Sequence, residues 1–366
     1  MRVLLRSSFD TYTGYGNDAV DMAVWLQRMG VDVVPWPAGI MPGLPKQFTD
    51  LLTKEPSGEY DVALTFAPPF DVRPWEFAGL GRVAVGWSMW ERTPLQRADM
   101  VGHLWPNAGR RARWWSQGPR SKQGRKKDWL DLMVVTCWDN VDAFSHLDPD
   151  VRYSVTPNGI DPTRFPVLDR DDPGTRPLRF LSVGMLAGRK DPFATIQAWR
   201  RAKEIEPEFD AELVLKTSTS GLHPAMMDAY PGLTIITEVW PPERLLALYA
   251  SCDVYVSTSR GEGNNKPAME FMSTGGPVMA TDWSGHRNWL HPDYGYPLTG
   301  TLVEDPRTGT SDFRVDVEAA AQKMVDVWRD PWAARWRGEG SASFIRSNLS
   351  WEKVLKRLLH QISEVM

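Results

Sequence analysis

The chain has 366 residues, which is too many for one ordinary hydrophobic core and predicts two domains. Hydrophobic residues make up 42% of the chain and charged residues 24%, a balance that excludes disordered and fibrous proteins. The formal net charge of −4 gives no overall attraction to nucleic acid or to anionic membranes, so any such binding needs a local basic patch.

Nothing in the sequence indicates export or a membrane span. The chain becomes charged again at Arg6 after a short apolar run, unlike a signal peptide, and no run reaches the roughly 18 apolar residues of a spanning helix. Cys137 and Cys252 lie in separate apolar stretches and predict reduced core residues rather than a disulfide. We therefore expect a cytoplasmic protein without a transmembrane segment.

The first half of the chain alternates short β-branched runs with helical patterns, which predicts a parallel sheet with crossover helices. A helix is expected from Asn17 to Met29, where apolar residues recur at helical spacing and Gly30 follows as a stop signal. The predicted strands are Arg2–Arg6, Val31–Pro35, Asp61–Phe66, Arg82–Trp87, Asp131–Thr136 and Tyr153–Thr156.

The loop before the first helix contains Gly14 and Gly16 in a pattern similar to the dinucleotide fingerprint G-x-G-x-x-G/A. A nicotinamide site also needs an acidic residue near the end of the second strand, but that strand ends in Pro35 and Trp36, which disfavours an NAD-dependent oxidoreductase. The glycines either let backbone amides approach a donor phosphate or an acceptor, or they form a simple turn with a helix cap.

A basic stretch rich in tryptophan occupies residues 110–129. It is either a solvated loop or a contact, mainly through residues 110–127, for an anionic acceptor such as lipid headgroups, a polysaccharide or nucleic acid. The sequence does not choose between these readings.

The second half repeats the α/β alternation after a turn-rich stretch from Asn158 to Gly174, which predicts an interdomain linker. The helix after the first strand is predicted to begin with Asp191 as its cap and Pro192 at the first helical position. The predicted strands are Arg179–Gly184, Glu212–Thr217, Leu233–Thr237, Asp253–Thr258 and Pro277–Thr281.

The last helix, from Trp351 to Val365, has one apolar stripe that must pack against another element. We expect this helix to return to the N-terminal domain. The predicted domains are residues 1–160, residues 161–345 and the returning helix at 346–366.

Two carboxylates mark a candidate ligand site in the second half. Glu262 lies in a glycine-containing loop after a strand, and Glu270 lies in the helix that begins near Pro267. Open α/β sheets place ligands at the carboxyl ends of their strands, and carboxylates there suit the hydroxyl pairs of a ribose and a hexose. The alternative is that both glutamates lie on a solvated loop and helix face.

A diphosphate at this site would need cations, which Arg189 and Lys190 supply after the strand that ends at Gly184. The alternative for this basic pair is a surface turn. No metal is predicted, because the histidines lack ligand spacing and the Asp169-Arg-Asp171 triplet lies in the linker.

The spacing of Glu262 and Glu270 resembles the glutamate–seven residues–glutamate motif of the family 4 retaining glycosyltransferases, within group 1 of these enzymes. Pro157–Phe165 and Glu243–Asp253 are similar to the domain-connecting segment and to the helix before the motif, and Gly275 onward is similar to the strand after it. The resemblance implies the GT-B fold: α/β, with two facing Rossmann-like domains, parallel sheets and an interdomain cleft.

The resemblance also implies a function, which is retaining hexosyl transfer from a UDP- or GDP-sugar to an acceptor hydroxyl. No further cofactor is expected, and the acceptor is open among glycan, lipid, protein and modified nucleic acid. Glu262, Arg189 and Lys190 are the implied catalytic residues. The implied donor-binding residues are Glu270, Gly263, Asn264, Asn265, Lys266, Pro267, Gly184, Gly14 and Gly16.

The chain departs from the family at two positions. Met185 stands where many relatives have an arginine, so Arg189 is expected to take over that role. The family's N-terminal histidine is missing after the fourth strand. Tyr15, Ser88 and Glu91 are instead the candidate residues on the acceptor side.

Two other functions stay open from the sequence. One is a different reaction on a sugar nucleotide, such as epimerisation, on the same fold. The other is nucleic-acid binding through residues 110–129, in which case the glutamates would have no catalytic role.

Overall fold

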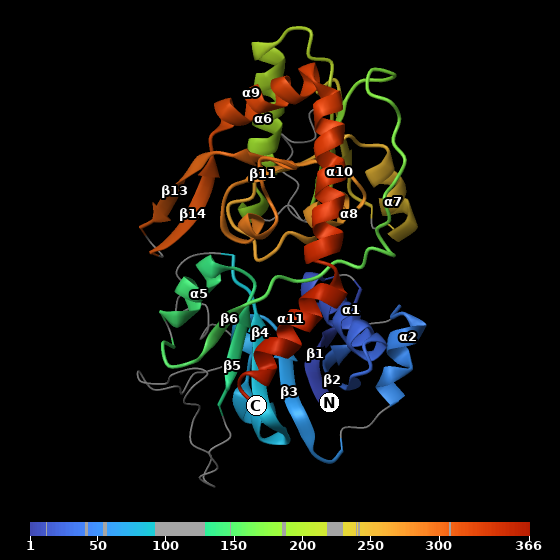
Figure 1. Cartoon of the computed structure of the whole chain (residues 1–366). Helices are drawn as coiled ribbons and strands as arrows, with labels where there is room; N and C mark the ends of the chain where they lie inside the picture. Colours follow the sequence, from blue (N-terminus) through green and yellow to red (C-terminus); the bar gives the residue numbers. More distant parts are fainter. Residues whose placement is uncertain are drawn as a thin grey trace. The chain divides into compact units, whose positions relative to one another are not determined.

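The computed structural model describes residues 1–11, 13–40, 43–53, 57–91, 129–146, 148–184, 188–217, 230–238, 240, 242–306 and 309–366. The chain divides into an N-terminal unit, Met1–Gly159 with Leu349–Met366, and a C-terminal unit, Ile160–Asn348. Each unit is built on a six-stranded parallel sheet with flanking helices (Figure 1). Within these ranges no helix combines the length and the apolar character that crossing a bilayer requires.

The sheet of the N-terminal unit has the strand order β2-β1-β3-β4-β5-β6. Its strands are β1 Arg2–Phe9, β2 Asp32–Ile40, β3 Tyr60–Phe66, β4 Gly81–Ser88, β5 Leu132–Val135 and β6 Tyr153–Val155. Its helices are α1 Gly14–Arg28, α2 Lys46–Thr49, α3 Pro74–Phe77, α5 Trp138–Ser145 and α11 Trp351–Ser363, with short 3₁₀ turns at Leu51–Thr53, Pro69–Asp71 and Ala78–Leu80. All six predicted strands are therefore present. Helix α1 begins three residues before the predicted start, because the Thr13 hydroxyl caps it by accepting from the Gly16 amide.

The C-terminal helix α11 belongs to the N-terminal unit, where it packs against α1 (Figure 1). Trp351 at its start is fully buried and meets the Trp87 ring edge-on, with 6.4 Å between the ring centroids. A Cβ atom at Gly159 would overlap Trp351, so a glycine at this position allows the close contact. The compact unit takes in the returning helix from residue 349, whereas the prediction drew that boundary at residue 346.

The C-terminal unit has the sheet order β12-β11-β10-β7-β8-β9. Its strands are β7 Arg179–Val183, β8 Glu212–Lys216, β9 Leu233–Ile236, β10 Val254–Ser257, β11 Val278–Thr281 and β12 Gly295–Leu298, with a separate antiparallel pair, β13 Gly300–Asp305 and β14 Thr310–Val315. Its helices are α6 Pro192–Ile205, α7 Pro242–Ala250, α8 Lys266–Ser273, α9 Val317–Arg329 and α10 Pro331–Asn348, with 3₁₀ turns η4 Gly188–Lys190 and η6 Ser284–Asn288.

Three strands of this unit, β12, β13 and β14, were not predicted from the sequence. Strand β12 contains Pro297, which lacks the amide hydrogen of a central strand and is tolerated here because β12 is an edge strand. Strands β13 and β14 pair with each other outside the main sheet, and β13 is largely exposed, so it has no apolar pattern to recognise.

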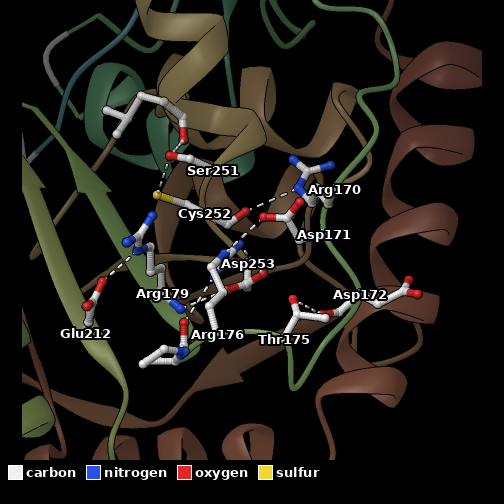
Figure 2. A network of polar contacts seen from close by, with 12 residues as sticks. Arg170, Asp171, Asp172, Thr175, Arg176, Arg179, Glu212, Ser251, Cys252 and Asp253 are labelled. Atoms are coloured by element: carbon white, nitrogen blue, oxygen red, sulfur yellow. Dashed lines mark hydrogen bonds and ion pairs between the residues drawn. The ribbon is translucent and has the colours of Figure 1, made fainter.

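The predicted linker is packed against the C-terminal unit rather than forming a free connection. Arg170 donates a hydrogen bond of 3.2 Å to the Cys252 carbonyl oxygen (Figure 2). It also donates to the carbonyl oxygens of Tyr249 at 3.4 Å and Thr274 at 2.7 Å, and to the Thr274 hydroxyl at 2.8 Å. These carbonyls lie at the ends of α7 and α8, so one guanidinium joins both helix ends; the Thr274 carbonyl also accepts from the Leu168 amide at 3.1 Å. Only the start of the predicted linker, at Gly159, coincides with a unit boundary.

The same segment ties together the amino ends of the strands. Arg176 holds Asp253 through two bonds of 2.7 and 3.1 Å, and the Arg179 amide donates to Asp253 at 2.7 Å (Figure 2). Arg179 begins β7 and Asp253 directly precedes β10, so this network lies at the amino edge of the sheet. Ligands of such sheets bind at the opposite, carboxyl edge.

Candidate functional site

The C-terminal sheet has the Rossmann strand order, with its first and fourth strands, β7 and β10, side by side. Chain connections leave these two strands in opposite directions, so a crevice opens beyond their carboxyl ends. The η4 turn with Arg189 and Lys190 follows β7, and the loop with Glu262 follows β10. The topology therefore brings the predicted cations and the predicted carboxylate to one place.

Glu262 forms a buried ion triad with both cations. Its Oε2 lies 2.8 Å from Arg189 Nη1, and its Oε1 lies 2.5 Å from Lys190 Nζ. The Glu262 side chain is 4% exposed, whereas those of Arg189 and Lys190 are 27% and 17% exposed. The carboxylate thus lies behind two cations that keep access to solvent.

The charge state of Glu262 follows from this geometry. Burial raises the pKa of the carboxyl, but Lys190 and then Arg189 outweigh burial and lower the pKa to about 2. Glu262 is therefore ionised at neutral pH, and the triad carries a net charge of about +1.

Residues 281–289 hold the Glu262 loop in place. The Ser284 hydroxyl and the Gly285 amide both donate to the Glu262 carbonyl, at 3.0 and 2.9 Å. The Trp289 indole donates to the Asn264 carbonyl at 2.9 Å, and a Cβ atom at Gly285 would overlap Gly263. The loop is thus fixed before any ligand binds, which favours precise recognition.

Glu270 lies on α8 and is also buried. Its Oε2 accepts a hydrogen bond of 2.9 Å from the Tyr249 hydroxyl on α7. Burial and then the Glu270 charge raise the pKa of Tyr249, so this tyrosine stays a neutral donor. Burial is the main cause that raises the pKa of Tyr255 on β10, and the charges of Glu262 and Glu270 act in the same direction.

Three residues other than glycine have a positive φ in the described part of the chain: Asp191 at 43°, Asn265 at 60° and Ser284 at 53°. All three lie in the loops around Glu262. Backbone strain of this kind costs about 1–3 kcal/mol per residue and gathers at functional sites. It therefore supports a ligand site at this edge of the sheet.

Asp191 occupies the cap position of α6 as predicted, and Pro192 begins the helix, but the Asp191 side chain does not form the expected cap bond. Its carboxylate instead accepts from Arg260 at 2.7 Å, and its carbonyl accepts from the Thr258 hydroxyl at 2.7 Å. The left-handed backbone at Asp191 turns the carboxylate away from the helix start.

The remaining predicted donor residues of this unit lie around the triad. Asn265 precedes α8, which begins with Lys266 and Pro267 in its first turn. The aliphatic part of Lys190 lies against Gly184, with the nearest carbon about 3.4 Å from where a Cβ would stand. A small pocket beside them is lined by residues that include Gly184, Lys190, Lys216, Tyr255 and Ser257.

In the N-terminal unit, Gly14 and Gly16 lie in the first turn of α1, whereas the prediction placed them in the loop just before the helix. A Cβ atom at Gly16 would overlap the Asp10 carboxylate, which accepts from the Thr13 amide and hydroxyl at 2.5 and 2.7 Å. Gly16 therefore leaves space for the Asp10 side chain of the same unit. Contact of the Gly14 and Gly16 backbone amides with a ligand stays a prediction.

The three acceptor-side candidates lie near the carboxyl end of β4 or in contact with it. The Tyr15 hydroxyl donates to the Met89 carbonyl at 2.9 Å and accepts from the Met89 amide at 3.0 Å. Burial and then the Glu91 charge raise the pKa of Tyr15. Ser88 is fully buried and Glu91 is half-buried. Tyr15 therefore has a structural role, and acceptor contact stays a prediction for all three.

Two features from the sequence lie outside the described residues: Met185, and the basic stretch at 110–129 apart from Trp129. The Asp169 and Asp171 pair is exposed and flanks Arg170 in the packed linker. Within the described ranges, no group of three or more His, Cys, Asp or Glu side chains is arranged to hold a metal ion.

Sequence reasoning missed three residues that shape this site. Tyr249 holds Glu270, and Thr281 and His286 lie under the Glu262 loop. Tyr249 lies in the Glu243–Asp253 segment that resembles the family, but no pattern gave it or the other two a role, because each acts through a contact between segments that are far apart in the chain. The serine–glycine–histidine run at 284–286, which begins three residues after the predicted strand end at Thr281, is a local signal that could have pointed to His286.

Comparison with known proteins bears on the same region. Residues 177–330 match the family model for glycosyl transferases group 1, a range that contains both glutamates and both cations of the site. No curated protein matches the chain by sequence.

Three solved glycosyltransferase structures share the fold. HepE of Anabaena with UDP and glucose has a TM-score of 0.61 at 13% identity, and each chain covers 100% of the other. Sucrose-phosphate synthase of Thermosynechococcus elongatus has a TM-score of 0.61 at 14% identity, again with 100% coverage of both. The pneumococcal O-GlcNAc transferase GtfA with UDP and GlcNAc has a TM-score of 0.55 at 14% identity, over 84% of this chain and 57% of that chain.

The chain has the GT-B fold. The likeness extends over the whole lengths of the first two structures, whereas the family model covers only the C-terminal region. Together they support a place in the superfamily of group 1 glycosyltransferases.

Proposed function

We propose that this chain transfers a sugar, with retention of configuration and without a metal, from a nucleotide-diphosphate sugar to an acceptor hydroxyl. The observation that carries the proposal is the ion triad of Glu262, Arg189 and Lys190 at the switch point of a GT-B donor-type sheet. It lies within the range that the group 1 family model matches.

The triad suits a diphosphate leaving group. Arginine has five N–H donors in a fixed fork and lysine has three, and both side chains stay partly exposed to solvent beside the buried Glu262 carboxylate. Because Glu262 is buried behind them, it orients both cations without meeting the diphosphate itself. An electrostatic cradle that is already ordered stabilises charge that develops on the leaving group.

The glutamates are assigned to hydroxyl groups of the donor. Glu270 binds the ribose hydroxyls, with one of its oxygens oriented by Tyr249. Glu262 binds sugar hydroxyls near the reacting carbon, since a carboxylate has about four acceptor positions. The backbone from Gly263 to Lys266, with Gly184, lines the sugar and phosphate subsites.

The proposed reaction is a front-face displacement. The bond between the anomeric carbon and the diphosphate oxygen breaks, and the acceptor oxygen bonds to the same face of that carbon. The acceptor's proton passes to the departing diphosphate, so no enzyme nucleophile and no metal is needed. Gly14 and Gly16 are assigned to donor phosphate or acceptor, and Tyr15, Ser88 and Glu91 to the acceptor side.

The test begins with a thermal-shift panel of UDP, GDP and their sugars, because a ligand that binds only the folded protein raises its Tm. Acceptors are then screened with the donor that binds, with and without EDTA. We expect turnover that EDTA leaves unchanged and a product with the donor's anomeric configuration by NMR. An inverted product, an EDTA-sensitive rate, or no nucleotide-sugar binding would each contradict part of the proposal.

Replacing Glu270 by alanine should weaken donor binding by roughly 1.5–3 kcal/mol, which is about ten- to a hundredfold in Kd. The reason is the loss of charge-assisted bonds to the ribose. Calorimetry with the donor from the panel measures the change, and Glu304→Ala on the exposed strand β13 is the matched control. Unchanged donor affinity in the folded Glu270 variant would refute the ribose role.

A further inference from the structure

The side-chain amide of Asn265, beside the Glu262 loop, is hydrogen-bonded through its nitrogen, whereas its oxygen has no partner among the described residues. Its Nδ2 lies 2.9 Å from His286 Nε2 and donates to the Ser257 hydroxyl at 3.0 Å. Its Oδ1 is buried and has no hydrogen-bond partner in the described part of the chain. The residue is 4% exposed, so an acceptor left in this state calls for an explanation.

The tautomer of the His286 ring determines whether the nitrogen or the oxygen of the Asn265 side-chain amide faces it. Its Nδ1 lies 2.8 Å from the Thr281 carbonyl oxygen and 3.1 Å from the Thr281 hydroxyl. A carbonyl oxygen only accepts, and the Thr281 hydroxyl already donates to the Ser259 carbonyl at 2.8 Å. The ring proton therefore stands on Nδ1, and Nε2 is an acceptor that requires a donor opposite it.

The His286 ring is also neutral, which is required for Nε2 to accept a hydrogen bond from the Asn265 amide. Burial is the main cause that lowers the pKa of His286 to about 4, with Lys190 and Arg189 acting in the same direction and Glu262 in the opposite one. At neutral pH, Nε2 thus keeps a free lone pair. The Asn265 amide must turn its NH₂ group to the ring, which leaves Oδ1 on the other side.

The neighbouring residue adds to the same subsite. Asn264 is also 4% exposed, and neither atom of its side-chain amide has a hydrogen-bond partner within the described ranges. Its carbonyl is held by Trp289, the residue whose ring lies 5.0 Å from that of His286. Two adjacent buried asparagines thus offer two acceptor oxygens and one donor group at the loop that carries Glu262.

We propose that His286 is a positioning residue that locks the Asn265 amide with Oδ1 toward the donor sugar, making Asn265 a selective acceptor for a sugar group that donates a hydrogen bond. The proposal rests on the proposed function and deepens it. A donor hydroxyl or amide N–H satisfies Oδ1, whereas a fluoro or deoxy group at the same place leaves it buried and unpaired.

The orientation itself is tested without any ligand. With ¹⁵N-labelled histidine, we expect the His286 resonances, assigned by their absence in His286→Gln, to show the Nδ1–H tautomer at pH 7. In Asn265→Asp an acceptor replaces the NH₂ group opposite Nε2, so His286 should become protonated on both nitrogens. An Nε2–H tautomer in the wild type, or an unchanged ring in Asn265→Asp, would overturn the proposal.

The proposal predicts that changes at His286 weaken binding of a nucleotide sugar but not of the nucleotide diphosphate alone. Calorimetry with UDP and UDP-glucose, and with GDP and GDP-mannose, should show that His286→Leu weakens the bound nucleotide sugar about five- to tenfold and leaves the nucleotide diphosphate unchanged. His286→Gln, which keeps an amide near the Nε2 position, should recover most of the loss. His291→Leu, at an exposed histidine, is the matched control.

The outcomes distinguish the two claims. Equal weakening of nucleotide and nucleotide sugar, or no weakening in a folded His286→Leu variant, overturns the positioning role. If the wild type binds none of these nucleotide sugars while the tautomer and the Asn265→Asp response are as expected, the amide orientation stands and the proposed function fails.

Discussion

Glu262 and His286 are both buried and ionisable, but at neutral pH Glu262 is charged and His286 is neutral. Glu262 stays charged because Lys190 and Arg189 outweigh the cost of burial, whereas His286 is neutral because burial dominates. Burying a lone charge costs several kcal/mol, so the carboxylate depends on both cations. At the scale of single residues, the site is therefore sensitive to acid.

Lowering the pH should destabilise the protein through both groups. The pKa of His286 falls from 6.5 to about 4 on folding, so the folded state binds fewer protons and stability is lost as the pH falls from 6.5 to 4. The pKa of Glu262 falls from 4.5 to about 2, so its contribution is lost between pH 4.5 and 2.

Urea unfolding of the wild type and of His286→Gln measures the histidine part of this effect. Between pH 7 and pH 5 the wild type should lose about 2 kcal/mol more of its free energy of unfolding than the variant does. His291→Gln should behave as the wild type, because its ring is exposed. Parallel pH profiles for the wild type and His286→Gln would contradict a buried, neutral His286.

At the scale of elements, the carbonyl groups at the ends of α7 and α8 hold neighbouring segments of the C-terminal unit together. Helix α8 ends with Gly275 in the left-handed region, and the Gly276 and Gly275 amides donate to the Phe271 and Met272 carbonyls. Arg170 adds donors to Thr274, whose carbonyl also accepts from the Leu168 amide, and to Cys252 just after α7. The guanidinium is largely buried, and that burial lowers its pKa to about 10.

Arg170→Met should therefore destabilise the C-terminal unit strongly. It keeps most of the side-chain volume but removes the guanidinium's hydrogen bonds to carbonyl oxygens at two helix ends, which should cost about 2–4 kcal/mol and lower Tm by roughly 5–15 °C. Calorimetric unfolding measures the change. Arg335→Met, which removes an exposed pair with Asp172, should cost less than about 1 kcal/mol. Similar losses in both variants would show that Arg170 acts only as a surface charge.

At the scale of the whole molecule, the chain leaves the N-terminal unit at Gly159 and comes back to it at Leu349. The stability of the N-terminal unit therefore depends on the last residues of the chain. Trp351, Val354, Leu355, Leu358 and Ile362 form its buried face on α11.

Trp351→Ala should open the N-terminal unit selectively. Removing a fully buried tryptophan should cost about 3–5 kcal/mol, and hydrogen exchange should speed up in β1, β4 and α1 while the C-terminal sheet keeps its protection. Trp336→Ala, at a side chain in α10 that is 68% exposed, should change neither. Uniformly faster exchange in both units would mean that the chain unfolds as one body.

Much of the fold could be predicted because its signals are local. All eleven predicted strands are present, since each is a short run rich in apolar or β-branched residues between turn residues. The spacing of Glu262 and Glu270, with Pro267 between them, was enough to expect a loop followed by a helix. Strand β12 was missed because it is an edge strand that contains a proline, and β13 was missed because it is largely exposed and lacks that apolar pattern; β14 pairs only with β13.

By itself the sequence determined the two α/β halves, the loop and helix of the glutamate motif, and a basic turn after the first strand of the second half. Only the tertiary structure decided that Glu262 meets Arg189 across 73 residues of chain and that His286 meets Asn265 across 21. Such contacts depend on which strands become neighbours and on which side chains then share one buried space. Local periodicity carries no information on either, because it reports only how a segment divides its own residues between core and solvent.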